Sequence, residues 1–251
     1  MDQRGSMDQR GSMTITENVK KSIEQLRRQV CDLHGELIKW GLVAWTAGNI
    51  SARVPGADLL VIKPSGVSYD ELTPDNMVVT DFDGNVVEAD FDPVDAALGP
   101  AGGGLLPSSD TFAHGYVYKH MPDVGGVVHT HSTYATAWAA RREPIPCVLT
   151  MMGDEFGGEI PVGPFALIGD DSIGQGIVST LRQSRSKAVL MANHGVFTIG
   201  RDARAAVKAA VMCEEVAKTV HVARQLGVPH LIGQADIDHL YERYQHVYGQ
   251  K

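Results

Sequence analysis

Short apolar runs of strand length alternate with helical patterns in this chain, and this alternation restricts the fold more than any other feature. The strand-like runs lie at residues 59–62, 77–82, 123–128 and 188–193. Apolar residues spaced by three and four positions from Val19 to Trp40 predict a long helix, and Asp202 is expected to cap a second one that ends near Leu226. Strands with interspersed helices predict a single α/β domain over residues 13–251, with a central mixed or antiparallel sheet flanked by helices.

Weaker signals divide the remaining sequence. Asp83-Gly84 between two apolar runs predicts a β-hairpin, and Thr14 with Glu17 is a candidate capping box for the first helix. Residues 89–106 are rich in Ala, Gly, Pro and Asp, so we expect a mobile surface loop there. Residues 152–158 are expected to form a glycine-flanked turn that carries two acids.

The composition and the first residues narrow the class of protein. Residues 1–12 are the hexapeptide Met-Asp-Gln-Arg-Gly-Ser written twice, which we interpret as the remnant of an expression tag. The net charge of −8 argues against nucleic acid or an anionic membrane surface as the main partner. No signal peptide is visible and no apolar run approaches the length of a membrane span, so a cytoplasmic protein is expected.

His129-Thr130-His131 ends one of the apolar runs and is the strongest sign of chemistry in the chain. Side chains alternate between the faces of a strand, so these two imidazoles are expected to point the same way. His194 ends another apolar run and is followed by Gly195. Three histidines at strand ends suggest a catalytic metal site with an open position, because a structural site would fill its fourth position. Taken alone, His-x-His is equally compatible with a chance pair of one packed and one solvated ring.

Three small turns that are rich in hydrogen-bond donors precede the histidines: Gly48-Asn49, Ser65-Gly66 and Ser108-Ser109. Glycine lets a backbone approach a ligand closely, and amides and hydroxyls at a helix start bind phosphate well. Together these turns would form an uncharged phosphate site, which suits an acidic protein. Each turn taken singly is also an ordinary structural turn.

Three further side chains are candidates for proton transfer or metal binding. Asp110 could serve as an oxygen ligand or as a base beside the metal, and its alternative role is to cap the helix predicted at 111–120. Asp154 lies in the predicted glycine-flanked turn and could carry protons, although a solvated turn is the commoner fate of such a segment. Tyr248 stands near the end of the chain, where it matters only if the tail folds over a site.

These motifs occur in an order that resembles the class II aldolase/adducin family, and within it the L-ribulose-5-phosphate 4-epimerases. The resemblance extends from about Val19 to Gln250. Each motif is weak alone, but six in the family's order are specific. They are Ala47-Gly48-Asn49-Ile50-Ser51, Ile62-Lys63-Pro64-Ser65-Gly66, Pro107-Ser108-Ser109-Asp110-Thr111, His129-Thr130-His131-Ser132, Asn193-His194-Gly195 and Tyr248-Gly249-Gln250.

The resemblance implies a mixed sheet flanked by helices and a homotetramer with active sites at subunit interfaces. By analogy, His129, His131 and His194 would hold Zn²⁺, or another divalent ion such as Mn²⁺ or Co²⁺, with Asp110 beside it. The phosphate of a phosphorylated ketose would be bound by the three small turns, whose matching residues are Gly48, Asn49, Ser65, Gly66, Ser108 and Ser109. Asp154 and Tyr248 match the proton carriers of the epimerases, which a neighbouring subunit helps to supply.

The sequence also favours one branch of the family. Fuculose-phosphate-type aldolases usually carry Glu after the Ser-Ser pair, whereas this chain has Asp110, as the epimerases do. The expected reaction is conversion of L-ribulose 5-phosphate to D-xylulose 5-phosphate by cleavage and re-formation of the C3–C4 bond. Two features depart from the epimerase pattern. The pattern has His-Ala-Asp-Tyr around the position of Asp154, where this chain has Met152-Gly153-Asp154-Glu155. The segment at residues 89–106 is longer in this chain than in the pattern. The alternatives are an aldolase acting on fuculose or rhamnulose phosphate, a sugar-acid phosphate decarboxylase, and a non-enzymatic adducin-like module, against which the three histidines argue.

Overall fold

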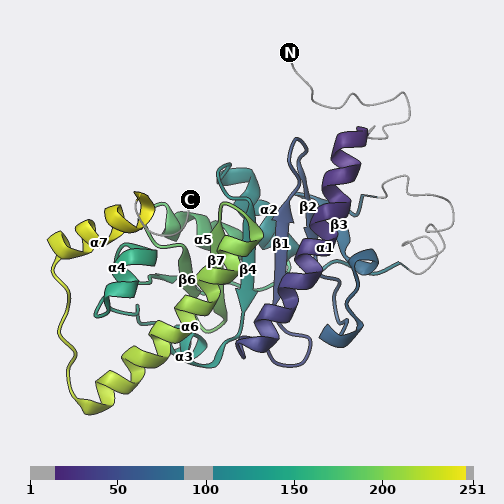
Figure 1. Ribbon diagram of the computed structural model, residues 1–251. Coiled ribbons are helices and arrows are strands. Elements are labelled where there is room, and N and C mark those ends of the chain that lie inside the picture. The colour runs from purple at the N-terminus through teal and green to yellow at the C-terminus, as the bar shows by residue number, and fades with distance from the viewer. Residues whose placement is uncertain (1–14, 88–103, 247–251) are drawn as a thin grey trace.

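The protein folds around one central β-sheet with helices on both faces (Figure 1). The computed structural model describes residues 15–87 and 104–246. The strands are β1 (Asn49–Arg53), β2 (Leu59–Ile62), β3 (Val78–Asp81), β4 (Gly126–Thr130), β5 (Val162–Gly163), β6 (Ala188–Met191) and β7 (Gly195–Gly200). The helices are α1 (Glu17–Lys39), α2 (Thr111–His120), α3 (Thr133–Arg141), α4 (Thr150–Phe156), α5 (Ser172–Leu181), α6 (Ala203–Leu226) and α7 (Gln234–His246), with short 3₁₀ turns η1 (Tyr69–Glu71) and η2 (Pro74–Asn76).

The sheet is mixed, as the sequence predicted. Its seven strands lie in the order β3-β2-β1-β4-β7-β6-β5. Only the edge pair β5–β6 is parallel, and every other neighbouring pair of these strands is antiparallel. The single α/β domain with a mixed sheet flanked by helices is therefore confirmed.

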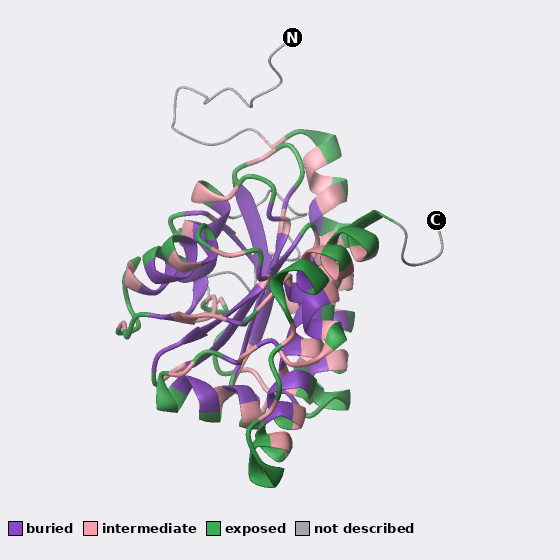
Figure 2. Ribbon diagram, turned by 90° about the vertical axis from the view of Figure 1, so that its left-hand side faces the viewer, coloured by how far each residue is buried: buried purple, intermediate pink, exposed green. Residues whose placement is uncertain are grey.

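The two faces of the sheet are covered by different helices. Strand alternation sends Leu59 and Val61 of β2 into one apolar cluster and Leu60 and Ile62 into another. The strands are consequently buried on both sides, as their colour in Figure 2 shows. A sheet covered on both faces explains why its strands read as continuous apolar runs rather than as alternating ones.

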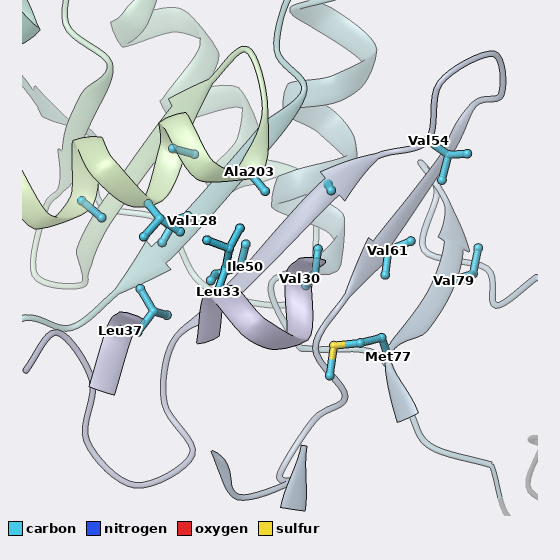
Figure 3. Close-up of a cluster of buried hydrophobic side chains, with 14 of the residues drawn as sticks. Val30, Leu33, Leu37, Ile50, Val54, Val61, Met77, Val79, Val128 and Ala203 are labelled. Carbon is cyan, nitrogen blue, oxygen red and sulfur yellow. The ribbon is translucent and has the colours of Figure 1, made fainter. Parts of the chain in front are cut away.

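Helices α1 and α6 cover the first face, in front of the strands in Figure 1. Val30, Leu33 and Leu37 of α1 point toward Ile50 of β1 and Val128 of β4 (Figure 3). Each such side chain, once fully buried, contributes about 1.5–3 kcal/mol relative to an exposed position. The apolar residues whose spacing predicted α1 are therefore the ones that pack this helix against the sheet.

Helices α2 and α5 cover the opposite face. Val117 of α2 and Ile177 of α5 are fully buried, and both pack into the same cluster as Val127 and Phe197 of the sheet. Helix α2 is thus fixed against the sheet along its length. Its first residue, Thr111, directly follows the Ser108-Ser109-Asp110 segment, so the position of α2 sets the position of that segment.

The predicted helix ends are mostly found where the sequence placed them. Asp202 caps α6, with its carboxylate accepting a hydrogen bond from the amide of Ala205 at 2.8 Å. The predicted cap of α1 is wrong. Thr16, not Thr14, is the N-cap, because α1 begins at Glu17, whose carboxylate then lies in the first turn beside the positive end of the helix.

Two other predictions need correction or limits. Residues 152–158 do not form a turn, because α4 extends to Phe156 and only Gly157 and Gly158, with φ +63° and +152°, leave the helix. Helix α7 packs closely on Gly153, since a Cβ there would lie 2.8 Å from Cδ1 of Leu240, which would have to shift. The hairpin at Asp83-Gly84 is present, but its second arm is reduced to a bridge between Thr80 and Val86.

Some predictions fall outside the described residues. These are the tag-like residues 1–12, most of the loop predicted at 89–106, and Tyr248. Over residues 15–87 and 104–246, no helix has the length and apolar character that crossing a membrane requires.

Acid is expected to destabilise this fold through a buried histidine of α1. The ring of His34 donates from Nδ1 to the carbonyl of Val30 (2.7 Å) and accepts at Nε2 from the amide of Ile50 (3.1 Å), so it is held neutral. Burial lowers the pKa of His34 to about 3. The unfolded chain therefore binds a proton between about pH 6.5 and 3 that the folded chain does not, and stability falls as the pH falls through this window.

We expect His34→Gln to reduce the pH dependence of the unfolding free energy by about 1.4 kcal/mol per pH unit in that window. Urea titrations at several pH values between 6.5 and 4.5 would measure it. His221→Gln, at an exposed position of α6, is the matched control and should keep the slope of the parent protein. An unchanged slope in His34→Gln would contradict the prediction.

Candidate active site

The register of the sheet brings the predicted residues to one end of the central strands. Asn49, the first residue of β1, lies directly opposite His129 of β4. β4 in turn pairs with β7, where Thr130 lies opposite Val196, so His194 just before β7 comes close to the His129-Thr130-His131 segment. Antiparallel pairing thus gathers residues far apart in the sequence at the same end of the central strands.

The three histidines come together. One ligand atom from each of His129, His131 and His194 lies within 4.8 Å of the others, and the Nε2 atoms of His129 and His131 are 2.8 Å apart. Gly195 permits this approach, because a Cβ there would lie 2.6 Å from the carbonyl oxygen of Thr130 and 2.8 Å from Cδ2 of His131. Any larger residue after His194 would push the β6–β7 turn away from β4.

The surroundings of His129 and His194 favour the neutral ring that binds metals. Nδ1 of the buried His129 donates to the carbonyl of Val196 at 2.9 Å, which leaves the lone pair on Nε2 directed at the other histidines. Burial lowers the pKa of His129 to about 3, and burial also lowers the pKa of His194. Neutral imidazole with its second nitrogen hydrogen-bonded to a carbonyl is the usual form of a metal ligand.

Asp110 lies beside the histidines in a network of its own. It occupies the N-cap position of α2, yet its side chain makes no cap hydrogen bond. Instead, Nδ2 of Asn49 donates to Oδ2 of Asp110 (2.8 Å) and to Oγ of Ser108 (3.0 Å). Burial raises the pKa of this carboxyl, but the nearby His129 and His114 and the Asn49 amide outweigh it and hold the pKa below its usual value. The carboxylate is not among the three groups that lie within 4.8 Å of one another, so as a metal ligand Asp110 stays a prediction.

The three small turns line the same cavity as the histidines. This cavity, of about 230 Å³, is lined by Gly48, Asn49, Ser65, Gly66, Ser108 and Ser109 together with Asp110 and all three histidines. Gly48 has φ +84°, and a Cβ there would lie 2.6 Å from Cγ1 of Val43. The segments are tied together, since Ser108 donates its amide to the carbonyl of Lys63 at 3.0 Å. The cavity therefore joins a nitrogen cluster to an array of amides and hydroxyls.

Sequence reasoning missed the buried cation of this cavity, Lys63. Only 2% of it is exposed, and its ammonium contacts the carbonyls of Thr46 (3.4 Å) and Pro64 (3.3 Å) and the ring of Tyr69. Within the described residues it forms no ion pair with a carboxylate. Burial lowers its pKa. The sequence offered only its place between a predicted strand and Pro64-Ser65-Gly66, which does not reveal that it is buried.

The structure describes only one of the two predicted proton carriers, Asp154. Asp154 does not line this cavity. It lies on α4, where its carboxylate accepts a hydrogen bond from Arg243 of α7 at 3.1 Å. Tyr248 lies beyond the described residues. A larger groove of about 850 Å³, near Cys147 and Arg185, contains none of the predicted site residues.

Comparison with known proteins agrees with this arrangement. The family model described as the class II aldolase and adducin N-terminal domain matches residues 28–221. The L-ribulose-5-phosphate 4-epimerase UlaF of Salmonella paratyphi C is 40% identical over 215 residues, which cover 80% of this chain and 86% of that protein. UlaF of Salmonella typhi matches to the same extent.

Solved structures share the fold. An L-fuculose 1-phosphate aldolase superposes with a TM-score of 0.75 at 26% identity, covering 88% of this chain and 96% of that one. YgbL of Klebsiella pneumoniae, described as a putative aldolase/epimerase/decarboxylase, superposes with a TM-score of 0.73 at 26% identity and covers 87% of this chain and 99% of that one.

Proposed function

Because the chain belongs to the class II aldolase and adducin family, we propose that it is a metal-dependent epimerase that converts L-ribulose 5-phosphate to D-xylulose 5-phosphate. One observation carries the proposal: three histidine nitrogens and the six residues of the small turns line a single cavity. The 40% identity to an epimerase supports the choice of reaction.

The residues fit a divalent cation. His129, His131 and His194 offer three nitrogen donors at close range, and Oδ1 of Asp110 is buried without a hydrogen-bond partner in the described part of the chain. Nitrogen donors with a nearby carboxylate suit Zn²⁺, and also Mn²⁺ or Co²⁺. When bound, such an ion supplies a Lewis acid that stabilises negative charge developing on the substrate's oxygens.

The phosphate of the ketose would be bound at the opposite part of the cavity. Asn49 donates from Nδ2 to Oγ of Ser108, so this hydroxyl accepts from Asn49 and can donate its own proton to a phosphate oxygen. The positive end of the α2 helix dipole also favours an anion there. Lys63 would neutralise part of the phosphate charge. Holding the phosphate fixes the reacting carbons relative to the histidines.

The reaction we propose breaks and re-forms the C3–C4 bond. A base takes the proton of the C4 hydroxyl, and the phosphate residues retain glycolaldehyde phosphate while its aldehyde rotates. Addition to the opposite face then inverts C4, and an acid returns the proton. Asp154 and Tyr248 would serve the two faces. Since Asp154 does not line the cavity of its own chain, we propose a homotetramer in which the neighbouring subunit supplies these groups.

An aldolase that releases its aldehyde is the second candidate. The superposition on an L-fuculose 1-phosphate aldolase at 26% identity supports it, because one fold would serve both reactions. The two differ in outcome. An aldolase forms dihydroxyacetone phosphate or a related free fragment, whereas an epimerase retains both fragments until they recombine.

The deciding experiment is incubation of the zinc-loaded protein with L-ribulose 5-phosphate, with D-xylulose 5-phosphate followed by a coupled assay. We expect product in the absence of chelator and none after chelation. Metal-bound protein that forms no product would exclude the epimerase. Release of a free aldehyde or of CO₂ from other sugar phosphates would then assign the chain to the aldolases or decarboxylases.

Lys63→Met is expected to weaken substrate binding more than turnover. Methionine keeps the apolar stem of the side chain but removes the charge. Charge-assisted hydrogen bonds are typically worth about 1.5–3 kcal/mol, so KM should rise about 10- to 100-fold while kcat changes less. Steady-state kinetics on L-ribulose 5-phosphate would measure this. Lys39→Met, at an exposed ion pair with Glu36, is the matched control. Unchanged KM in Lys63→Met would remove Lys63 from the phosphate site.

A further inference from the structure

The turn that carries His194 is built from strained residues outside the cavity. Among the described residues, three that are not glycine have positive φ, namely Trp45, Arg142 and Asn193. Two of these are hydrogen-bonded to each other, since Nε of Arg142 donates to Oδ1 of Asn193 at 2.7 Å. Left-handed backbone is unfavourable for most side chains and far less so for asparagine. Two such residues in direct contact mark a junction that the fold holds in one geometry.

Asn193 fastens the β6–β7 turn to the end of α3. Within the turn, the amide of His194 donates to the carbonyl of Met191 at 3.0 Å. The amide of Asn193 donates to the carbonyl of Ala139 at 3.0 Å, and its side chain donates to Ala140 at 3.4 Å. These carbonyls belong to the last turn of α3, where a helix leaves carbonyls without intrahelical partners. Arg142, the left-handed C-cap of α3, completes the junction from the other side.

The other end of α3 begins at a second candidate metal ligand. His131 is followed directly by Ser132, the N-cap of this nine-residue helix. That end is also fixed, because the carboxylate of Glu214 in α6 accepts the amides of Tyr134 and Ala135, both at 2.9 Å. A short helix held at both ends therefore connects His131 to the turn of His194.

We propose that Arg142 and Asn193 are positioning residues that set His194 relative to His131 through α3, and so set the affinity and geometry of the divalent metal site. This inference rests on the proposed function, because it assumes that the histidines bind a metal. Neither residue lines the cavity, so neither touches metal or substrate. Their effect is exerted through the backbone of the turn.

The variants follow from the geometry. Asn193→Ala removes the side-chain hydrogen bonds and disfavours positive φ, so metal affinity should fall about 10- to 100-fold, as it does when supporting residues around metal ligands are lost. Arg142→Gly retains the left-handed backbone but removes the donor, and a smaller loss is expected. Asn193→Asp keeps the acceptor for Arg142 and the tolerance for positive φ but loses the donor to Ala140, so affinity should recover most of the loss seen in Asn193→Ala. Arg141→Ala, one residue away in a surface ion pair with Glu143, is the control and should leave affinity unchanged.

The experiment is titration of the metal-free full chain with Co²⁺, followed by its visible absorption and by competition with a chelator, while circular dichroism checks folding. Weaker binding and an altered cobalt spectrum in folded Asn193→Ala, with recovery in Asn193→Asp, is the expected result. If the parent binds Co²⁺ and both Asn193→Ala and Arg142→Gly match it in affinity and spectrum, the inference is wrong. A parent that binds cobalt but does not epimerise the substrate overturns the proposed reaction and leaves this series valid. A parent that binds no cobalt overturns both.

Discussion

Replacing His129 by alanine is expected to remove the bound metal and to lower kcat/KM by at least about 1,000-fold. His129 is the most deeply buried of the three histidines, and its Nδ1 is fixed on the carbonyl of Val196. Its loss leaves two nitrogens, whereas catalytic sites of this kind generally use three protein ligands. Metal content by elemental analysis and kcat/KM on L-ribulose 5-phosphate would be measured on the same preparation.

The loss must be separated from unfolding. His129→Ala deletes a buried ring and leaves the carbonyl of Val196 without this donor, so a stability loss of about 2–4 kcal/mol is expected. Thermal unfolding of the metal-free variant should therefore stay cooperative, with a midpoint below that of the metal-free parent but above the assay temperature. His221→Ala, at an exposed position of α6, should keep full metal content and turnover. Full activity in a metal-free His129→Ala protein would refute the mechanism.

The sequence was sufficient to predict where the histidines and the phosphate-type turns would meet. Strand alternation predicted that His129 and His131 would point the same way, and their Nε2 atoms do approach to 2.8 Å although His131 lies just beyond the end of β4. The resemblance supplied the order of the segments. The register adds the physical reason, because Asn49 lies opposite His129 and Thr130 opposite Val196. These contacts follow from local patterns repeated along strands, which is the kind of information a single sequence carries well.

Other parts of the site depend on tertiary packing and could not be predicted. Lys63 looks like a surface cation beside a turn, and only the packing of the surrounding segments buries it. Gly153 suggested a turn around Asp154, whereas it lies inside α4 with Leu240 of α7 packed closely against it. The junction between Arg142 and Asn193 joins residues 51 positions apart. No periodicity in the sequence records such a contact.

Asp154 and the three histidines of the same chain are expected to act in two different active sites of the oligomer. This arrangement can be tested by mixing variants. Asp154 lies on α4 against α7, with its carboxylate on Arg243, and it does not line the cavity of its own chain. Each active site would then take its metal ligands from one subunit and Asp154 from the next. A chain with His129→Ala still offers an intact Asp154, and a chain with Asp154→Asn still offers intact histidines.

Two inactive variants should therefore restore activity when they assemble together. With His129→Ala and Asp154→Asn chains co-expressed in equal amounts, about a quarter of the interfacial sites combine an intact histidine set with an intact Asp154. Turnover of the co-purified mixture should approach about a quarter of the parent value, although each variant alone is nearly inactive. Co-expression of His129→Ala with His194→Ala is the matched control, because both changes damage the same half of the site and no combination repairs it. Activity in the first mixture no greater than the sum of its two components would show that Asp154 does not act across a subunit boundary.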